Sequence, residues 1–409
     1  MTQATMAEAK KRILFVDDEI GVLQGLERML FEMADSWDMS FVDSADKALT
    51  ELNEREFDVI VSDMRMPGMD GATLLAHVHD EYPNVVRIIL TGHSELEATL
   101  RAMPVAHSFL TKPCKPAILE EVVRRSLSLQ SLLESDSLRT LVGSVAGLPV
   151  RPEVYTRLTE AIADPHIEMG QIARIVSGDV ALAAKVLHLT NSAFFGSKRK
   201  FISIDQAVSF IGMRMLRKVV LSAEVFSAFS PKQSLGGLSL DQEQRHGLVC
   251  AGVARKIAPD PETGEYAFLA GMLHDIGKLV LASRAPKIMR QLTRQRVVGH
   301  SVPPETEEQI TGTNHGRLGA YLLGLWGIEH PLVEAVAFHH QPAVCQSSSF
   351  DLPSIVHVAD ALVHAIENER AGRPAELQVD RAHLESLGVL GKLDGWTDEA
   401  RDLWDRDSG

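Results

Sequence analysis

The chain has 409 residues, of which 45% are hydrophobic and 23% are charged, an ordinary composition for a soluble globular protein. This length predicts two or three domains. The 41 basic residues stand against 55 acidic ones, and the net charge of −14 argues against broad nonspecific nucleic-acid binding, which needs a positive field.

Three cysteines lie far apart in the chain, at Cys114, Cys250 and Cys345, without a CxxC pattern. This usage is typical of free thiols in a reducing compartment. The first apolar run contains only four residues before the charged Asp17, so we expect no signal peptide. No apolar stretch approaches the length of a membrane span. The sequence therefore predicts a cytoplasmic protein without membrane insertion.

Residues 12–116 alternate short apolar runs with amphipathic helical segments, the βα pattern of a parallel sheet. Because the carboxyl ends of parallel strands meet at one edge of a sheet, polar residues that follow such runs are expected to lie close together. These residues are Asp17 and Asp18 after residues 13–16, Asp63 after 59–62, Thr91 after 86–90, and Lys112 after 108–111.

The residue types at these strand ends suit a phosphorylatable aspartate. A carboxylate that attacks a phosphoryl group needs a divalent cation nearby, and Mg²⁺ prefers carboxylates, waters and phosphate oxygens. Asp17, Asp18 and Asp63 offer such ligands, while Lys112 balances the charge of an acyl phosphate and Thr91 donates a hydrogen bond to it. A cis bond before Pro113 would direct the lysine inward.

These positions, together with the loop Met64–Gly71, resemble a response-regulator receiver domain over residues 1–120. The resemblance implies a flavodoxin-like, doubly wound α/β fold with strand order 2-1-3-4-5, and phosphorylation by a histidine kinase. The alternative is a nucleotide-binding sheet with scattered acidic residues. The implied roles are Asp63 as phosphoacceptor; Asp18, Asp63 and the backbone carbonyl of Arg65 as Mg²⁺ ligands, with Asp17 acting through water; and Thr91, Lys112 and Phe109 as switch residues.

Apolar residues recur at helical spacing from Ala117 to about Leu141. This pattern predicts that the last receiver helix continues as a connector over residues 117–142. The connector either pairs two subunits into a homodimer or packs on its own chain.

Strand signals nearly vanish beyond a break at residues 143–149. We expect an all-α domain over residues 141–342, followed by an extension at 343–409 that is partly helical and exposed. Helices are expected at 152–163, 168–176, 179–190, 204–228, 240–257, 264–283, 286–297, 305–325 and 330–340, with another from Pro353.

Histidines and acids recur in the second half of the chain. Adjacent His274 and Asp275 lie in an apolar segment, where burial is costly unless a metal compensates both groups. Imidazoles and carboxylates that converge from several helices suit Zn, Mn, Fe or Ni. Taken singly, each residue also has a structural interpretation: a packed histidine, a helix cap at His315, or a surface acid at Asp360. The candidate ligands are His246, His274, Asp275, His315, His339, His340 and Asp360.

This order of residues resembles the HD superfamily of metal-dependent phosphohydrolases, in which Lys278 would face a substrate phosphate. Residues 179–196, 202–212, 312–326 and 339–342 are more narrowly similar to the HDOD domain, an HD-related output domain. That resemblance implies a binding or regulatory module. Gln341 and Pro342 follow the paired histidines where the cyclic di-GMP phosphodiesterases have an acid, and the chain has no Gly-Tyr-Pro loop, which opposes that activity.

The sequence therefore predicts a phosphorelay response regulator whose helical output domain binds a downstream signalling protein or a small ligand. The alternative is a receiver-controlled, metal-dependent phosphohydrolase or phosphodiesterase. A transcription factor is a third possibility, but no basic helix-turn-helix is evident and the acidity opposes direct nucleic-acid binding.

Overall fold

The structure is a computed structural model that describes residues 10–92, 96–133, 135–145, 148, 152–164, 166–191, 200–221, 235–295 and 302–407. Backbone contacts divide the chain into two compact units. The described part of the first unit ends at Ser131 and that of the second begins at Leu132, inside the range 117–142 that was predicted as a connector.

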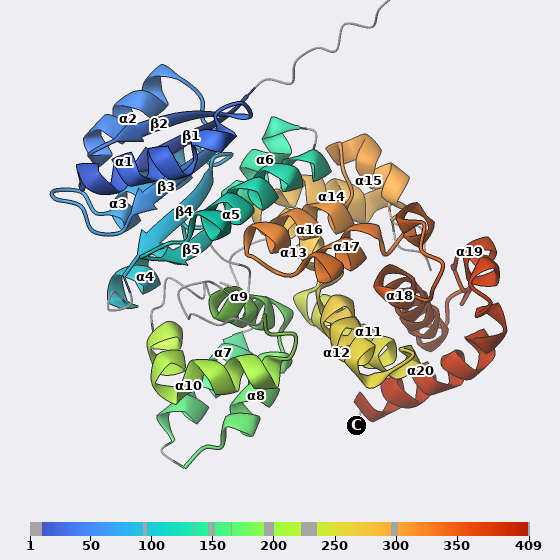
Figure 1. Cartoon of the computed structure of the whole chain (residues 1–409). Coiled ribbons are helices and arrows are strands. Elements are labelled where there is room, and N and C mark those ends of the chain that lie inside the picture. The colour runs from blue at the N-terminus through green and yellow to red at the C-terminus, as the bar shows by residue number, and fades with distance from the viewer. Residues whose placement is uncertain are drawn as a thin grey trace, which may run out of the picture. The chain divides into compact units, whose positions relative to one another are not determined.

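The N-terminal unit is built on a five-stranded parallel sheet with the order β2-β1-β3-β4-β5, as predicted. The chain adds β2 on one side of β1 and then β3, β4 and β5 on the other side. The connecting helices therefore cover both faces of the sheet (Figure 1). The strands are β1 (Lys11–Val16), β2 (Trp37–Val42), β3 (Val59–Asp63), β4 (Val86–Thr91) and β5 (Ser108–Thr111), and the helices are α1 (Ile20–Met29), η1 (Phe31–Met33), α2 (Ala45–Glu54), α3 (Gly71–Glu81), α4 (Leu96–Ala102) and α5 (Pro116–Leu129).

The central strands are buried on both faces, which explains their continuous apolar runs. The loop after β3 then leads into α3, where the Asp70 side chain accepts a hydrogen bond from the Thr73 N–H and caps the helix. A Cβ at Gly71 would collide with the carbonyl oxygen of Asp63, so only glycine allows the start of α3 to approach the end of β3 this closely.

The predicted continuous connector over residues 117–142 is wrong. Helix α5 ends at Leu129, a 3₁₀ turn follows at Gln130–Leu132, and α6 begins at Asp136. Ser135 has an extended backbone at the N-cap of α6, and serine and aspartate favour such helix starts over helix interiors. A dimer that pairs one unbroken helix over this range is therefore not available. Of the predicted break at 143–149, residues 146, 147 and 149 lie outside the described residues.

The described residues of the second unit form helices only, as predicted (Figure 1). Its elements are α6 (Asp136–Gly143), α7 (Pro152–Ala163), α8 (Met169–Ser177), α9 (Val180–Asn191), α10 (Ile204–Leu221), α11 (Leu240–Ile257), α12 (Pro261–Leu273), α13 (Ile276–Arg284), α14 (Pro286–Gln295), α15 (Pro304–Thr311), α16 (His315–Leu325), α17 (His330–Phe338), η4 (Pro342–Cys345), α18 (Leu352–Arg370), α19 (Arg381–Ser386), η5 (Leu390–Lys392) and α20 (Leu393–Asp407).

Two helices that were predicted to be continuous are each split in two. The segment 264–283 breaks at His274 and Asp275, because Asp275 (φ −97°, ψ 9°) lies outside the helical region at the N-cap of α13. The segment 305–325 breaks where Gly312 adopts φ 82° and ends α15. Asn314 then caps α16 by accepting a hydrogen bond from the Arg317 N–H. Both breaks lie beside candidate metal ligands.

The C-terminal extension belongs to the core of the helical unit, so the expectation that it is exposed is wrong. One apolar cluster contains residues of α11, α12, α18 and α20. Trp396 and Trp404 of α20 are buried in it, together with Val249 and Val253 of α11. Asp360, a predicted ligand whose alternative interpretation was a surface acid, lies on α18 and is also buried, which excludes that alternative.

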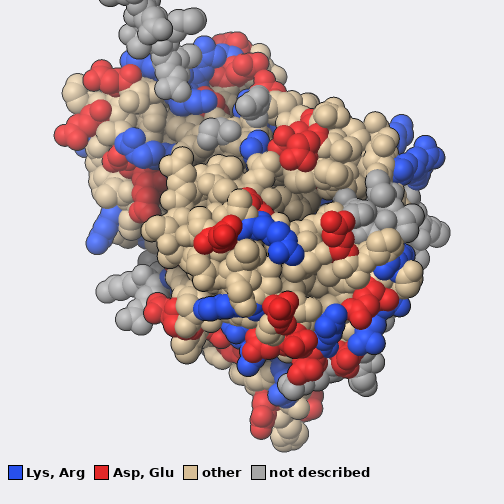
Figure 2. All heavy atoms as spheres, turned by 90° about the vertical axis from the view of Figure 1, so that its right-hand side faces the viewer, with Lys and Arg blue, Asp and Glu red and all other residues tan. Residues whose placement is uncertain are grey.

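Charged side chains of both signs lie close together on the face shown in Figure 2, where the described residues form no extended basic stripe. None of the described helices combines the length and the apolar composition that crossing a bilayer requires.

Candidate functional site

The strand-end residues of the N-terminal unit meet around Lys112. Its Nζ atom lies 2.6 Å from Asp17 Oδ2 and also forms an ion pair with Asp63 Oδ1. The other oxygen of Asp63 accepts a hydrogen bond from the Arg65 N–H at 2.8 Å, and Asp17 Oδ1 accepts one from the Glu19 N–H at 3.0 Å. We call Asp17, Asp18, Asp63, Thr91 and Lys112 the strand-end pocket.

Burial sets the electrostatics of this pocket. It raises the pKa of Asp63, whereas the hydrogen bond and charge of Lys112 oppose the rise. Burial lowers the pKa of Lys112, but its bonds to Asp17 and Asp63 more than offset this, so its pKa lies above the usual value. The Lys112 side chain therefore stays positively charged between the carboxylates of Asp17 and Asp63. Carboxylate oxygens of this kind are the donors that Mg²⁺ prefers, and the residues fit that ion.

The remaining predicted residues of this pocket differ in exposure. Asp18 is exposed at the end of β1, whereas Thr91 is fully buried at the end of β4. Phe109 is already buried, at 2% exposure. The peptide bond before Pro113 is cis, which confirms that prediction. Arg65 contacts Asp63 through its N–H, and its carbonyl remains a predicted ligand.

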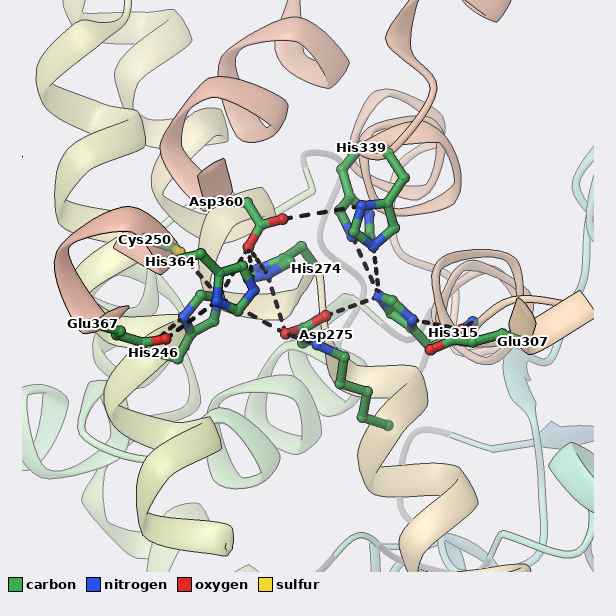
Figure 3. A network of polar contacts seen from close by, with 12 residues as sticks. His246, Cys250, His274, Asp275, Glu307, His315, His339, Asp360, His364 and Glu367 are labelled. Carbon is green, nitrogen blue, oxygen red and sulfur yellow. Dashed lines mark hydrogen bonds and ion pairs between the residues drawn. The ribbon is translucent and has the colours of Figure 1, made fainter. Parts of the chain in front are cut away.

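All seven candidate ligands of the helical unit come together in one buried network (Figure 3). Asp275 lies at its centre, with Oδ2 3.3 Å from His274 Nε2 and Oδ1 3.0 Å from His315 Nε2. Asp360 Oδ1 lies 3.0 Å from His246 Nε2. A Cβ at Gly277 would collide with the carbonyl oxygen of His315, so this glycine allows α13 and α16 to approach closely enough to bring Asp275 beside His315.

Hydrogen bonds to the Nδ1 atoms fix how three of these imidazoles are oriented. His274 donates its Nδ1–H to the carbonyl of Gly271 at 2.7 Å, and His339 donates to the carbonyl of Val336 at 2.8 Å, since a carbonyl can only accept. His315 Nδ1 lies 2.7 Å from the Glu307 carboxylate. Their Nε2 atoms therefore point into the network, the arrangement that metal-ligating histidines adopt.

Three Nε2 atoms converge in what we call the imidazole cluster, formed by His315, His339 and His340. The Nε2 atom of His315 lies 3.4 Å from that of His339 and 3.1 Å from that of His340. Burial, reinforced by neighbouring charged histidines, holds the pKa values of His339 and His340 well below the usual range. Neutral His339 and His340 offer the lone pairs of their Nε2 atoms beside His315, so this cluster fits a divalent metal.

A second group, the thiol cluster, contains His246, Cys250, His274 and Asp360. Burial alone would lower the pKa of His274, but the charge of Asp275 raises it well above the usual range. Nevertheless, His274 Nε2 is buried and has no hydrogen-bond partner among the described residues. An unsatisfied atom of this kind is costly in a protein interior, and a bound cation would satisfy it.

A cavity of about 320 Å³ opens beside the network. Lys278, Arg245 and Arg373 contribute cationic side chains to its wall, and His246 belongs to both the wall and the thiol cluster. Lys278 Nζ lies 2.6 Å from Asp275 Oδ2. The wall also contains the carboxylates of Glu243, Glu307 and Glu367, so the cavity brings charged groups of both signs next to the candidate metal ligands.

Three residues of the network were missed by the sequence predictions: Cys250, His364 and Glu367. Two of them stand at helical spacing from Asp360, at i+4 and i+7, and this signal was available. Glu367 contacts both His246 Nδ1 and His364 Nδ1 at 3.1 Å. Cys250 follows His246 by one helical turn. Glu307, which the structural interpretation of His315 as a helix cap had paired with it, does contact His315.

Comparisons with known protein families agree with both units. The response regulator receiver domain matches residues 13–124, and the HDOD domain matches residues 148–342.

Several known proteins are similar to parts of the chain. An uncharacterized protein of Treponema pallidum is 24% identical over 322 residues, which are 77% of this chain and 60% of that protein. The hydrogenase transcriptional regulatory protein HoxA of Cupriavidus necator is 32% identical over 31% of this chain and 26% of its own length. The C4-dicarboxylate transport transcriptional regulatory protein DctD of Pseudomonas aeruginosa is 32% identical over 44% of this chain, which spans 37% of that protein.

Two solved structures also show similarity. The MmoQ response regulator of Methylococcus capsulatus matches 59% of this chain and 98% of its own, with 19% identity and a TM-score of 0.44. The signal receiver domain of an HD domain-containing protein of Pseudomonas fluorescens matches 30% of this chain and 98% of its own, with 34% identity and a TM-score of 0.29. From the two family matches, the chain belongs to the response regulators that carry a receiver domain followed by an HDOD domain.

Proposed function

We propose that this response regulator accepts a phosphoryl group on Asp63 from a histidine kinase, and that phosphorylation controls a metal-bearing HDOD output domain. The observation that carries the first step is the position of Lys112, whose ammonium contacts both Asp17 and Asp63. A carboxylate nucleophile with a fixed cation beside it, at the carboxyl edge of a parallel sheet, suits phosphoryl transfer.

In the proposed reaction, an oxygen of Asp63 attacks the phosphorus atom of the kinase phosphohistidine and forms an acyl phosphate, while the phosphorus–nitrogen bond breaks and the imidazole leaves. Mg²⁺ held by Asp17, Asp18, Asp63 and the Arg65 carbonyl would neutralise phosphoryl oxygens. Lys112 keeps its contact with Asp17 and balances the added charge. The Thr91 hydroxyl donates to a phosphoryl oxygen, and with buried Phe109 it carries the switch to the surface of the receiver domain.

The purified full-length chain tests this step with acetyl phosphate, a small phosphoryl donor that needs no kinase. We expect one phosphoryl group per chain in the presence of MgCl₂, detected as a mass increase of the intact protein, and none after Mg²⁺ is removed with EDTA. Labelling that is insensitive to EDTA, or that occurs on another residue, contradicts the proposed pocket.

For the output domain we propose regulatory binding of a downstream protein or a small ligand, with the cavity beside Lys278 as the ligand site. The support is the combination of a hollow about 320 Å³ in volume with cationic wall residues and a buried ligand network.

Metal-dependent phosphoester hydrolysis is the second candidate function, favoured by the imidazole cluster and by the central position of Asp275 between two candidate metal sites. Divalent ions bound there would polarise a phosphoryl oxygen and lower the pKa of a bound water. Lys278 would hold a substrate phosphate from the cavity side, and Asp275 would keep that lysine in place.

Turnover of bis(p-nitrophenyl) phosphate by Mn²⁺-loaded or Zn²⁺-loaded protein separates the two output functions. If the domain is a hydrolase, replacing Lys278 by glutamine should lower the rate by about 10²-fold or more, because one charged contact to the transition state is lost. The Lys256→Gln variant is a matched control, since Lys256 is exposed on α11 and pairs with Glu399. An inert, metal-loaded wild-type protein leaves regulatory binding as the function.

A further inference from the structure

The described cysteines differ sharply in their surroundings. Cys114 and Cys345 are partly exposed, whereas Cys250 is fully buried and lies in the thiol cluster. Its Sγ atom is 3.4 Å from His246 Nε2, and both residues lie on α11, one turn apart. Figure 3 shows the sulfur beside the imidazoles and the carboxylate of Asp360.

We propose that Cys250 binds a zinc ion as a thiolate, together with His246, His274 and Asp360, and that this zinc site is closed by four protein ligands. The inference rests on the proposed metal-bearing output domain and adds the identity and role of one of its ions. The two clusters then differ in their donor atoms. The thiol cluster has sulfur, nitrogen and oxygen donors, and the imidazole cluster has three imidazole nitrogens.

The distances between the ligand atoms agree with a tetrahedral zinc site. Bond lengths of 2.0–2.3 Å place neighbouring ligand atoms about 3.3–3.6 Å apart around a tetrahedral ion. Two observed separations lie in this range: 3.4 Å from Cys250 Sγ to His246 Nε2 and 3.6 Å from His274 Nε2 to Asp360 Oδ1. His246 Nε2 and Asp360 Oδ1 are closer, at 3.0 Å.

A second observation, independent of the cysteine, also points to a ligand here. His274 is fully buried, its Nδ1–H is held by the Gly271 carbonyl, and its Nε2 atom faces the cluster without a hydrogen-bond partner among the described residues. Likewise, the Nδ1 atom of His246 is held by Glu367 at 3.1 Å, which leaves Nε2 directed at Asp360 and Cys250. These outer contacts orient ligands for a metal.

The donor types select the ion. A thiolate with imidazole and carboxylate partners suits zinc, whereas oxygen-seeking ions such as Mg²⁺ and Mn²⁺ gain little from sulfur. Burial raises the pKa of the Cys250 thiol, and binding would release its proton to solvent, because a coordinating thiol is deprotonated by the ion.

Four protein ligands around one ion leave no position for a substrate, which is the pattern of structural zinc sites. The imidazole cluster offers three histidine ligands, one fewer than a closed tetrahedral site, and therefore retains an open position. Any ligand or substrate that contacts a metal would then do so at the imidazole cluster, while the zinc ion joins α11, α18 and the end of α12.

Cobalt substitution of the full-length protein tests the thiolate directly. After metal removal and addition of Co²⁺, the wild-type protein should show a thiolate-to-cobalt charge-transfer band in the near ultraviolet. The band should be lost in Cys250→Ser and Cys250→Ala, and should persist in the matched variants Cys114→Ser and Cys345→Ser. In the zinc-loaded wild-type protein, X-ray absorption should detect one sulfur at about 2.3 Å for every two zinc ions, which requires no variant.

The possible results separate this inference from the proposed function. Bound cobalt without a charge-transfer band, or zinc without a sulfur neighbour, overturns ligation by Cys250 and leaves the metal-bearing output domain intact. A wild-type protein that binds neither ion overturns both.

Discussion

The Asp63→Asn variant is expected to incorporate no phosphoryl group from acetyl phosphate, whereas wild-type protein incorporates one per chain. Asparagine keeps the shape of the side chain but removes the nucleophilic oxygen and one of the two carboxylates that contact Lys112. The fold should survive, because Lys112 retains its bond of 2.6 Å to Asp17. We expect the free energy of unfolding to change by no more than about 1–2 kcal/mol.

Asp46→Asn is the matched control for this experiment, since this substitution makes the same chemical change at an exposed residue of α2. It should be labelled like the wild-type protein. Labelling of Asp63→Asn at the wild-type level would remove Asp63 as the phosphoacceptor.

The Asp275→Asn variant is expected to lose both metal ions of the HDOD domain. Asp275 lies between the two clusters, with one oxygen 3.3 Å from His274 Nε2 and the other 3.0 Å from His315 Nε2, so a neutral amide weakens both sites. The loss also leaves Lys278 and the buried histidines without their central negative charge. Breaking a buried ion network in this way costs about 3–5 kcal/mol of the free energy of unfolding.

Metal content by elemental analysis and unfolding by urea provide the two readouts. Asp398→Asn is the matched control, because that aspartate is 81% exposed on α20 and contacts only Arg401 among the ion pairs of the described residues. His340→Gln should lose only the ion of the imidazole cluster. Two ions retained by Asp275→Asn would show that the clusters bind metal without a shared ligand, or not at these residues.

Removing the metal ions from the wild-type protein with a chelator should also lower its free energy of unfolding. At a metal concentration 100 times the dissociation constant, binding adds about 2.7 kcal/mol of stability, which corresponds to a shift of roughly 5–10 °C in the melting temperature of a domain of this size.

The receiver domain could be predicted from the sequence because its polar site residues lie at the ends of strands. Each strand ends where an apolar run stops, and the residue at that point is read directly from the chain. The strand order and the contacts of Lys112 agree with those predictions. The break between α5 and α6 was harder, because Leu132 and Leu133 continue the helical spacing while Ser135 and Asp136 interrupt it.

The helical domain shows where local patterns fail. Two segments with continuous helical periodicity break at His274–Asp275 and at Gly312–Asn314, and the breaks direct His274, Asp275 and His315 into one network. Tertiary contacts, such as the close approach of Gly277 to His315, decide this geometry. Cys250 is a free cysteine, as predicted, and its neighbours in space come from α12 and α18, which no local pattern reveals because they are far away in the sequence.

Hydrogen–deuterium exchange on the metal-loaded, full-length chain, with and without acetyl phosphate and Mg²⁺, tests most directly whether the receiver controls the output domain. The account predicts altered exchange around Asp63 and Lys112 and also in the helices that carry the ligand network, α11, α13 and α18, with neither change in Asp63→Asn. A change confined to residues 10–131, with the HDOD helices exchanging identically in both states, would contradict phosphorylation as the control of this output domain.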